Sequence, residues 1–199
     1  MRVVGESFDA GEQMVASQLD LERPLILLIP NILRMEECEE WIDMIKAKGP
    51  EPAPINTARG VRVVSEFRNN RRVMFDDPGR ANELFERVRS AVPQNIHRME
   101  LVGVNERLRC YEYQAGQYFA PHQDGAFIRS DNEQSRYTFM VYLNEGFDGG
   151  ETIFLVEPEK VITPKSGLAL LFQHPIIHEG AKVKTGTKYV VRTDLMYRR

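Results

Sequence analysis

Two histidines and one aspartate in the C-terminal half of the chain have the spacing of metal ligands. His122 and Asp124 form a His-x-Asp step, and His178 lies much further along the chain. On a β-strand, residues i and i+2 project from the same face, so we expect His122 and Asp124 to share a face. Two imidazoles and one carboxylate form the facial triad of non-haem Fe(II) oxygenases, which leaves positions open for a cosubstrate and O₂. Lys188, ten residues beyond His178, could supply the cation that binds an anionic cosubstrate.

The His-x-Asp step is a weak signal when it is taken alone. With 4 histidines and 29 acidic residues among 199, chance gives roughly 0.6 such His-x-acid steps. The surrounding elements must therefore show that these residues can meet.

Length and composition predict one domain over residues 1–199, in which residues 1–100 supply supporting helices and strands and residues 101–199 the core. The net charge of −3 gives no overall signature of nucleic-acid binding. No apolar run is long enough to cross a bilayer, and the N-terminal residues show no apolar segment of a signal peptide. Cys38 and Cys110 are expected to be reduced core residues. We expect a cytoplasmic protein, and oligomeric state is not readable from the sequence.

One segment departs from this acidic balance. Five arginines fall within a short stretch that contains a single acidic residue, Glu66. They are Arg59, Arg62, Arg68, Arg71 and Arg72. The segment is either a solvated pair of strands or a rim that attracts an anionic substrate.

The N-terminal half contains the signals of one strand and two helices. The apolar run 25–29 predicts a buried strand. Cys38, Trp41, Ile42 and Ile45 recur at helical spacing before Gly49-Pro50, and the segment 51–60 is expected to be a loop. A second helix begins at Asp77 as N-cap and Pro78, and Pro93 ends it. Its expected apolar face is Ala81, Leu84, Phe85, Val88 and Val92.

The C-terminal half predicts a mainly β domain. Short runs rich in β-branched and aromatic residues are separated by turn residues. They lie near 107–113, 118–124, 137–143, 151–156, 160–163, 168–173, 177–183 and 188–197. Eight short strands fit a double-stranded β-helix, or jelly roll, with flanking helices. Residues 125–136 are expected to form a long polar loop.

The last run has two contrasting faces if it is one strand. Tyr189, Val191, Thr193, Leu195 and Tyr197 form an apolar face, and the opposite face carries charged residues. Those residues are Lys188, Val190, Arg192, Asp194 and Met196. Burial of an unpartnered lysine is unfavourable. This strand is therefore either an exposed edge strand or one whose Lys188 faces a cavity that takes an anion.

Three longer segments carry a resemblance to a known family. They are YEYQAGQYFAPHQD, RYTFMVYLNEGFDGGETIF and SGLALLFQHPIIHEGAKVKTGTKYVVRTDLMY. In order, spacing and intervening glycines, they resemble the catalytic domain of the prolyl 4-hydroxylase branch of the 2-oxoglutarate/Fe(II)-dependent oxygenases. The resemblance covers about residues 107–197, nearly half of the chain.

The resemblance implies a role for individual residues. His122, Asp124 and His178 look like the iron ligands. Lys188, with the hydroxyls of Tyr113 and Thr138, looks like the group that holds the distal carboxylate of 2-oxoglutarate. An ammonium neutralises such a carboxylate and hydroxyls donate hydrogen bonds to it.

Two further residues keep alternatives open. His174 competes with His178 as the distal ligand, and the spacing to Lys188 favours His178. His174 is then a supporting group near the site or an ordinary loop histidine. Arg192 lies on the Lys188 face, where it could assist the cosubstrate, bind substrate or pair with Asp194.

The function that follows from the resemblance is hydroxylation of a C–H bond by Fe(II), 2-oxoglutarate and O₂, with succinate and CO₂ as coproducts. A prolyl residue in a peptide or protein is the leading substrate. The alternatives are a free amino acid or small metabolite, or a cupin-like metal-binding module without 2-oxoglutarate turnover. Nucleic acid is a less favoured substrate because the chain is acidic. Neither the substrate nor the position that is oxidised can be read from the sequence.

Overall fold

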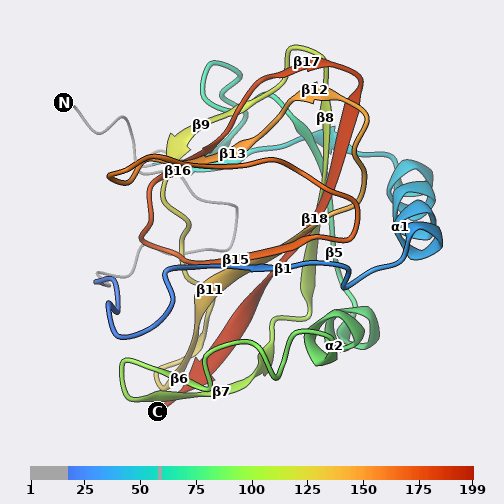
Figure 1. Ribbon diagram of the computed structural model, residues 1–199. Helices are drawn as coiled ribbons and strands as arrows, with labels where there is room; N and C mark the ends of the chain where they lie inside the picture. Colours follow the sequence, from blue (N-terminus) through green and yellow to red (C-terminus); the bar gives the residue numbers. More distant parts are fainter. Residues whose placement is uncertain (1–17, 58–59) are drawn as a thin grey trace.

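The computed structural model describes residues 18–57 and 60–199, and most of its strands belong to two sheets that face each other (Figure 1). The larger sheet has ten antiparallel strands, of which seven follow one another across the sheet. In spatial order these are β1 (Ile26–Ile29), β15 (Ala169–Gln173), β11 (Glu133–Tyr142), β18 (Thr187–Arg198), β8 (Arg107–Gln114), β5 (Arg71–Asp76) and β2 (Glu51–Pro52). The remaining three are β10 (Ile128–Ser130), β6 (Asn95–Ile96) and β7 (Met99–Val104).

The smaller sheet has four strands and lies opposite the central part of the larger one (Figure 1). Its order is β14 (Lys160–Ile162), β13 (Thr152–Phe154), β16 (His178–Gly180) and β9 (Phe119–His122). Two strand pairs complete the structure: β12 (Asp148–Gly149) with β17 (Val183–Thr185), and β3 (Ile55–Thr57) with β4 (Gly60–Arg62). Two facing antiparallel sheets with few helices are the jelly-roll fold that the sequence predicts.

Two helices cover the outer face of the larger sheet (Figure 1). Helix α1 (Met35–Lys48) buries Cys38, Trp41 and Ile45, and Gly49 ends it in the left-handed conformation with φ 67°. Helix α2 (Pro78–Glu86) begins as predicted, because the Asp77 side chain accepts a hydrogen bond from the Arg80 amide. Among the described residues, no helix is long and apolar enough to span a membrane.

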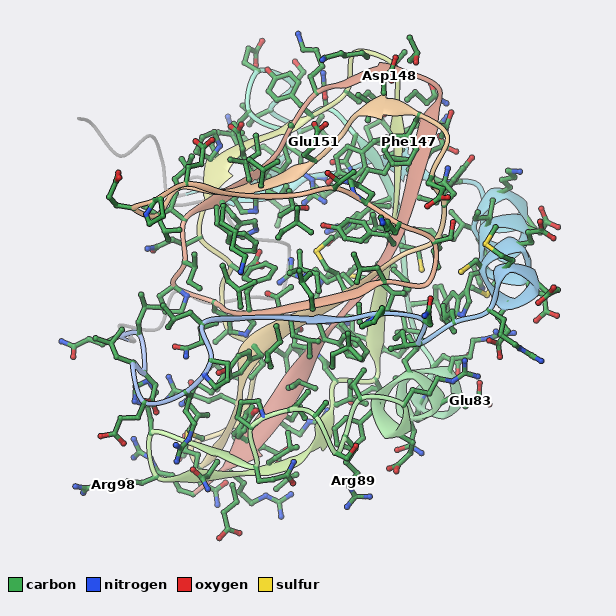
Figure 2. The ribbon with its side chains drawn as sticks, in the orientation of Figure 1. Glu83, Arg89, Arg98, Phe147, Asp148 and Glu151 are labelled. Atoms are coloured by element: carbon green, nitrogen blue, oxygen red, sulfur yellow. The ribbon has the colours of Figure 1, made fainter. Side chains whose placement is uncertain are left out.

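Most charged side chains lie on the outer surface, and the core is formed by apolar ones. Figure 2 shows Glu83, Arg89 and Arg98 projecting outward, and all three are exposed. The predicted apolar face of the second helix is buried in full, although α2 ends at Glu86. Val88 and Val92 therefore reach the core from the turns that follow the helix. Cys38 and Cys110 are buried free thiols, as expected.

Strand β18 is central in the larger sheet, with β11 on one side and β8 on the other. Its face with Tyr189, Val191 and Leu195 packs in the core beneath the helices, whereas Lys188 and Arg192 face the space between the sheets. The alternative of an exposed edge strand is therefore wrong. Pairing of β18 with β11 and β8 fixes the positions of Lys188 and Arg192.

Three segments differ from the sequence prediction. The segment 51–60, predicted as a loop, contains strands β2 and β3. The polar loop expected at 125–136 contains β10 and the beginning of β11, which pair with each other. The run 177–183 divides into β16 and β17, which belong to different sheets. Short strands of polar residues lack the alternation of apolar residues that marks a half-buried strand, so the sequence did not predict them.

Gly167 precedes β15 and packs closely against Leu33, which lies between β1 and α1, so a substitution here tests that contact. Its φ is 73°, and a Cβ at this position would lie 2.2 Å from the Leu33 carbonyl oxygen. Gly167→Ala is expected to lower the free energy of unfolding by about 2 kcal/mol or more, since a left-handed conformation alone costs an L-residue roughly 1–2 kcal/mol. Urea denaturation of the two proteins measures the difference.

Gly79→Ala is the matched control for this change. Gly79 lies in α2, and a Cβ there would meet only the Asp77 side chain, at 3.5 Å. Alanine is the better helix former, so stability should be unchanged or slightly higher. Equal losses in the two variants would contradict the account of Gly167.

Candidate metal centre

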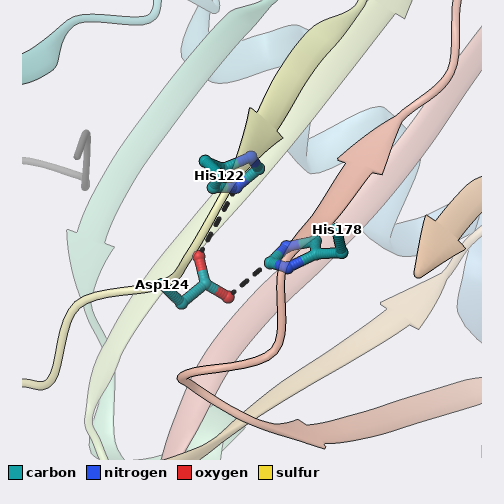
Figure 3. Close-up of side chains that lie close together, drawn as sticks. All are labelled: His122, Asp124 and His178. Atoms are coloured by element: carbon teal, nitrogen blue, oxygen red, sulfur yellow. Dashed lines mark ion pairs between the residues drawn. The ribbon is translucent and has the colours of Figure 1, made fainter. Parts of the chain in front are cut away.

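The three predicted ligands meet in the space between the two sheets. His122 and His178 lie directly opposite each other on the neighbouring strands β9 and β16. Asp124 follows β9, and its carboxylate lies between the two rings (Figure 3). Its Oδ1 is 3.7 Å from His122 Nε2 and its Oδ2 is 3.7 Å from His178 Nε2. The three side chains are buried and present one nitrogen or oxygen each within 4.8 Å of one another.

Both rings present an unprotonated nitrogen to this space. His122 Nδ1 is 2.8 Å from the Ala120 carbonyl oxygen, and His178 Nδ1 is 2.9 Å from that of Ile176. A carbonyl only accepts, so Nδ1 carries the proton and Nε2 keeps its lone pair. Burial lowers the pKa of His122 to about 3, helped by His178, and burial also lowers the pKa of His178. Two neutral imidazoles beside a carboxylate fit the ligand set of a non-haem Fe(II) site.

Asp124 is held at both oxygens by residues of the larger sheet. Thr138 Oγ1 donates a hydrogen bond of 2.5 Å to Oδ2, and Arg192 Nη1 lies 3.1 Å from Oδ1. Burial alone would raise the pKa of Asp124, but the Arg192 guanidinium holds the pKa below its usual range. The carboxylate is therefore ionised at neutral pH. The prediction that Asp124 shares a strand with His122 is wrong, because β9 ends at His122.

Aromatic rings fix the planes of the two imidazoles. Phe119 stacks on His122 with ring centres 3.5 Å apart, and Phe172 meets His178 edge-on at 4.4 Å. Arg68 also lies over the Phe119 ring, with its guanidinium carbon 4.3 Å from the ring centre. Stacking and cation–π contact of this kind hold a ring in one orientation.

A cavity extends from the metal centre to Lys188 and holds residues of both sheets. Lys188 Nζ donates to the Gly150 carbonyl oxygen at 2.6 Å and lies 5.2 Å and 5.3 Å from the rings of Tyr113 and Tyr142. Burial lowers the pKa of Lys188 to about 7. The cavity lining includes Tyr111, Tyr113, Thr138, Met140, Thr152, Phe172, Lys188, Val190 and Arg192. At its Lys188 end the cavity presents a buried cation beside the rings of Tyr113 and Tyr142, which is suited to bind an anion.

The four predicted cosubstrate residues all line this cavity, and two of them also contact the metal centre. Thr138 and Arg192 hold Asp124, whereas Tyr113 and Lys188 lie together on paired strands. Arg192 also lies 3.4 Å from Asp194, which in turn pairs with Arg109 at 3.1 Å. The pairing of Arg192 with Asp194, one of its sequence alternatives, is thus present in the structure. The roles of the four residues toward a cosubstrate stay predictions.

The basic segment 59–72 does not have the uniform exposure of a solvated strand pair. Arg62 is exposed, but Arg68 and Arg72 are buried; Arg59 lies outside the described residues. Arg68 Nε donates to Asn70 Oδ1 at 2.7 Å. The sequence signalled the charge of this segment, but gave no sign that Arg68 would support the stack on His122.

Near the centre lie also His174, which the sequence left as a competing ligand, a supporting group or a loop histidine, and Ser135, whose place the sequence did not indicate. His174 is buried, and its ring contacts Thr138 and Ser135 rather than the space between His122 and His178. Within the described residues, the group of possible metal ligands comprises His122, Asp124 and His178. This geometry favours His178 over His174 as the distal ligand.

Comparison with known families gives a match to part of the chain. Residues 107–193 match the model of the 2OG-Fe(II) oxygenase superfamily. This region begins with β8, which carries Tyr113, and includes every residue of the candidate centre and of its predicted cosubstrate pocket. No curated protein sequence matches the chain.

Several solved structures with a similar fold are named as prolyl hydroxylases. A viral collagen prolyl hydroxylase from Paramecium bursaria Chlorella virus-1, in complex with 2OG, is 23% identical with a TM-score of 0.61, and the match covers 88% of this chain and 97% of that one. A prolyl-4-hydroxylase of Pseudomonas putida is 16% identical with a TM-score of 0.67, covering 88% and 93%. A Trichoplax adhaerens prolyl hydroxylase, bound to a hypoxia inducible factor peptide, is 18% identical with a TM-score of 0.64, covering 86% and 83%.

Proposed function

We propose that this chain, which belongs to the 2OG-Fe(II) oxygenase superfamily through residues 107–193, hydroxylates a prolyl residue in a peptide or protein. Fe(II), 2-oxoglutarate and O₂ are the cofactor and cosubstrates of the enzyme, and succinate and CO₂ are the proposed coproducts. One observation carries the proposal: a buried two-histidine, one-carboxylate centre opens into a cavity that contains a buried lysine. A cupin-like metal module without 2-oxoglutarate turnover has no need of that lysine.

In this proposal, His122, Asp124 and His178 bind Fe(II). Their ring nitrogens and carboxylate already face one another, and their outer atoms are hydrogen-bonded or ion-paired to the protein. Such outer partners keep metal ligands in one orientation. The bound metal would supply activation of O₂, which is the oxidant for an unreactive C–H bond, and 2-oxoglutarate would supply the two further electrons that the reduction of O₂ requires.

The remaining cavity residues bind the cosubstrate and exclude water. Lys188 neutralises the distal carboxylate of 2-oxoglutarate, and the Tyr113 hydroxyl donates a hydrogen bond to the same group. Met140, Phe172 and Val190 supply apolar walls. A dry wall strengthens the attraction between the ammonium and the carboxylate, because the local dielectric constant is low.

The prolyl substrate is supported by the resemblance to the prolyl 4-hydroxylase branch and by the fold shared with prolyl hydroxylases. A direct test incubates the Fe(II)-loaded full chain, 2-oxoglutarate and O₂ with a proline-rich peptide library and, separately, with a metabolite extract. We expect succinate release that depends on peptide, and a mass gain of one oxygen on proline. Protein prepared without Fe(II) is the control. An oxygen gain only among small molecules would contradict the prolyl assignment, and an absence of succinate release in every mixture would contradict the oxygenase activity.

A further inference from the structure

We propose that His174 is a positioning residue of the metal centre, which acts through Thr138 to hold the Asp124 carboxylate in its ligating orientation. The inference rests on the proposed metal site. Its basis is a chain of hydrogen bonds in which each donor can be assigned. It joins the backbone of Phe127 to Ser135, His174, Thr138 and finally Asp124.

A β-bulge in β11 makes this chain possible. The pairing with β18 shifts between Ser135 and Tyr137, so Arg136 is an extra residue in the ladder. In a regular strand, Ser135 and Thr138 would point to opposite faces, because side chains alternate with period two. The bulge turns both hydroxyls toward His174, and the Arg136 carbonyl accepts a hydrogen bond from the His174 amide at 3.2 Å.

The direction of the bonds nearest the metal centre follows from the chemistry of Asp124. An ionised carboxylate only accepts, so the Thr138 hydroxyl donates to Oδ2, at 2.5 Å. That hydroxyl has a single proton, and its oxygen must therefore accept at its other contact. The contact is His174 Nδ1, at 3.0 Å, which consequently carries a proton.

The remaining bonds follow in the same way. Burial keeps the His174 ring neutral, so a proton on Nδ1 leaves Nε2 as an acceptor. Ser135 Oγ lies 2.8 Å from Nε2 and donates to it. The Ser135 oxygen in turn accepts from the Phe127 amide at 2.9 Å. The Asp124 carboxylate, which can only accept, thus determines the tautomer of His174, and the Phe127 amide at the other end leaves the Ser135 hydroxyl proton for His174.

The last acceptor in this series of hydrogen bonds distinguishes His174 from an ordinary buried histidine. An ordinary one satisfies its two nitrogens with groups that have no further role, whereas here the last acceptor is a proposed metal ligand. The backbone of His174 makes a separate bond, since its carbonyl accepts from the Asp124 amide at 3.1 Å. A change of the His174 side chain leaves that bond possible, so the contribution of the ring can be measured by itself.

Two substitutions of His174 distinguish the proposed donor from the bulk of the ring. In His174→Asn the amide nitrogen can stand near the position of Nδ1 and donate to Thr138. In His174→Gln the amide extends toward the position of Nε2 and Ser135. Loss of an outer partner of a metal ligand lowers metal affinity roughly 10–100-fold. His174 acts through Thr138 rather than on the ligand directly, so we expect His174→Gln to bind Co(II) about 10-fold more weakly than the original protein, at the low end of that range, and His174→Asn to bind within a few-fold of it.

Co(II) is the probe because its d–d absorption reports both binding and coordination geometry. His97→Gln is the matched control, since His97 lies between β6 and β7; among the described residues its Nε2 bonds to the Gln18 carbonyl oxygen, at 2.9 Å, and its Nδ1 lies 3.9 Å from the Asp20 carboxylate. It should leave Co(II) affinity and spectrum unchanged. Equal affinity and spectra for His174→Gln and the original protein would overturn the inference, as would equal weakening in the Asn and Gln variants. Failure of the original protein to bind Co(II) would instead overturn the metal site and the proposed function.

A second measurement needs no folded His174 variant. Nitrogen-15 NMR of the metal-free protein distinguishes the two neutral tautomers of each histidine. The structure predicts the Nδ1-protonated form for His122, His174 and His178, and the Nε2-protonated form for His97. The His97→Gln variant should therefore lose the single Nε2-protonated signal. A second Nε2-protonated histidine whose ring signals do not change on metal binding would be His174, because His122 and His178 are the proposed ligands. That result would overturn the proposed chain of hydrogen bonds.

Discussion

His178→Ala is expected to lower Fe(II)- and 2-oxoglutarate-dependent succinate release at least about 100-fold. The variant keeps two of the three proposed ligands, and even the loss of an outer partner of a ligand costs roughly 10–100-fold. His178 has no replacement nearby, because the His174 ring is held by Thr138 and Ser135. The Co(II) dissociation constant should rise with the loss of turnover, which locates the defect in metal binding.

The same measurement of Co(II) binding tests whether His178 or His174 is the distal metal ligand. His174→Ala is expected to weaken Co(II) binding less than His178→Ala, since His174 acts only through Thr138. His97→Ala serves as the control for the loss of a histidine outside the site. A protein that loses its metal with His174→Ala but keeps it with His178→Ala would reverse the assignment.

Lys188→Met is expected to weaken 2-oxoglutarate binding about 30-fold or more while Co(II) affinity stays the same. Truncating one member of a buried charge pair costs about 2–5 kcal/mol, and each 1.4 kcal/mol is a factor of ten. Methionine fills a similar volume without the charge. Titration of the Co(II)-loaded protein with 2-oxoglutarate gives the binding constants.

Stability should change in the opposite direction in this variant. Lys188 is buried and its pKa is lowered to about 7 by that burial, so the folded protein without an anion is destabilised by the ammonium. Lys188→Met should therefore unfold at a higher temperature when no 2-oxoglutarate is present. Lys184→Ala is the control, because Lys184 is exposed on β17. Unchanged 2-oxoglutarate affinity in Lys188→Met would show that the anion binds elsewhere.

The features that the sequence predicted best are those that depend on regular alternation. Strand β18 has Lys188 and Arg192 on one face and Val191 and Leu195 on the other, as period two requires. Both helices begin or end at the residues whose chemistry marks a helix terminus, Asp77 and Gly49. The sequence placed His122 and His178 in two separate strand runs, and the resemblance implied that they bind one metal; the structure pairs them on neighbouring strands.

The features that the sequence could not predict depend on a break in that alternation. A bulge at Arg136 brings Ser135 and Thr138 to the same side, and no residue type in this segment marks its position. Asp124 reaches its partners from beyond the end of β9. Both features depend on contacts between residues that are distant in sequence. The register of β11 with β18 places the bulge, and the hydrogen bond from the Asp124 amide to the His174 carbonyl holds the Asp124 backbone.

Arg68 shows the same limit for charged residues. Charge patterning offered a solvated segment or a rim of the site, but Arg68 is fully buried against Phe119. A guanidinium can be buried when an aromatic face and a hydrogen-bond acceptor receive it, and these partners come from different parts of the chain. The sequence alone does not show which partners the fold supplies.

The absorption spectrum of the anaerobic Fe(II) protein tests the central claim most directly. A 2-oxo acid that chelates Fe(II) in such a centre produces a metal-to-ligand charge-transfer band. We expect this band when 2-oxoglutarate is added to the Fe(II)-loaded protein, and no band in His178→Ala under the same conditions. A protein that binds Fe(II) but shows no band with 2-oxoglutarate, or a band that persists unchanged in His178→Ala, would contradict the assignment of this centre.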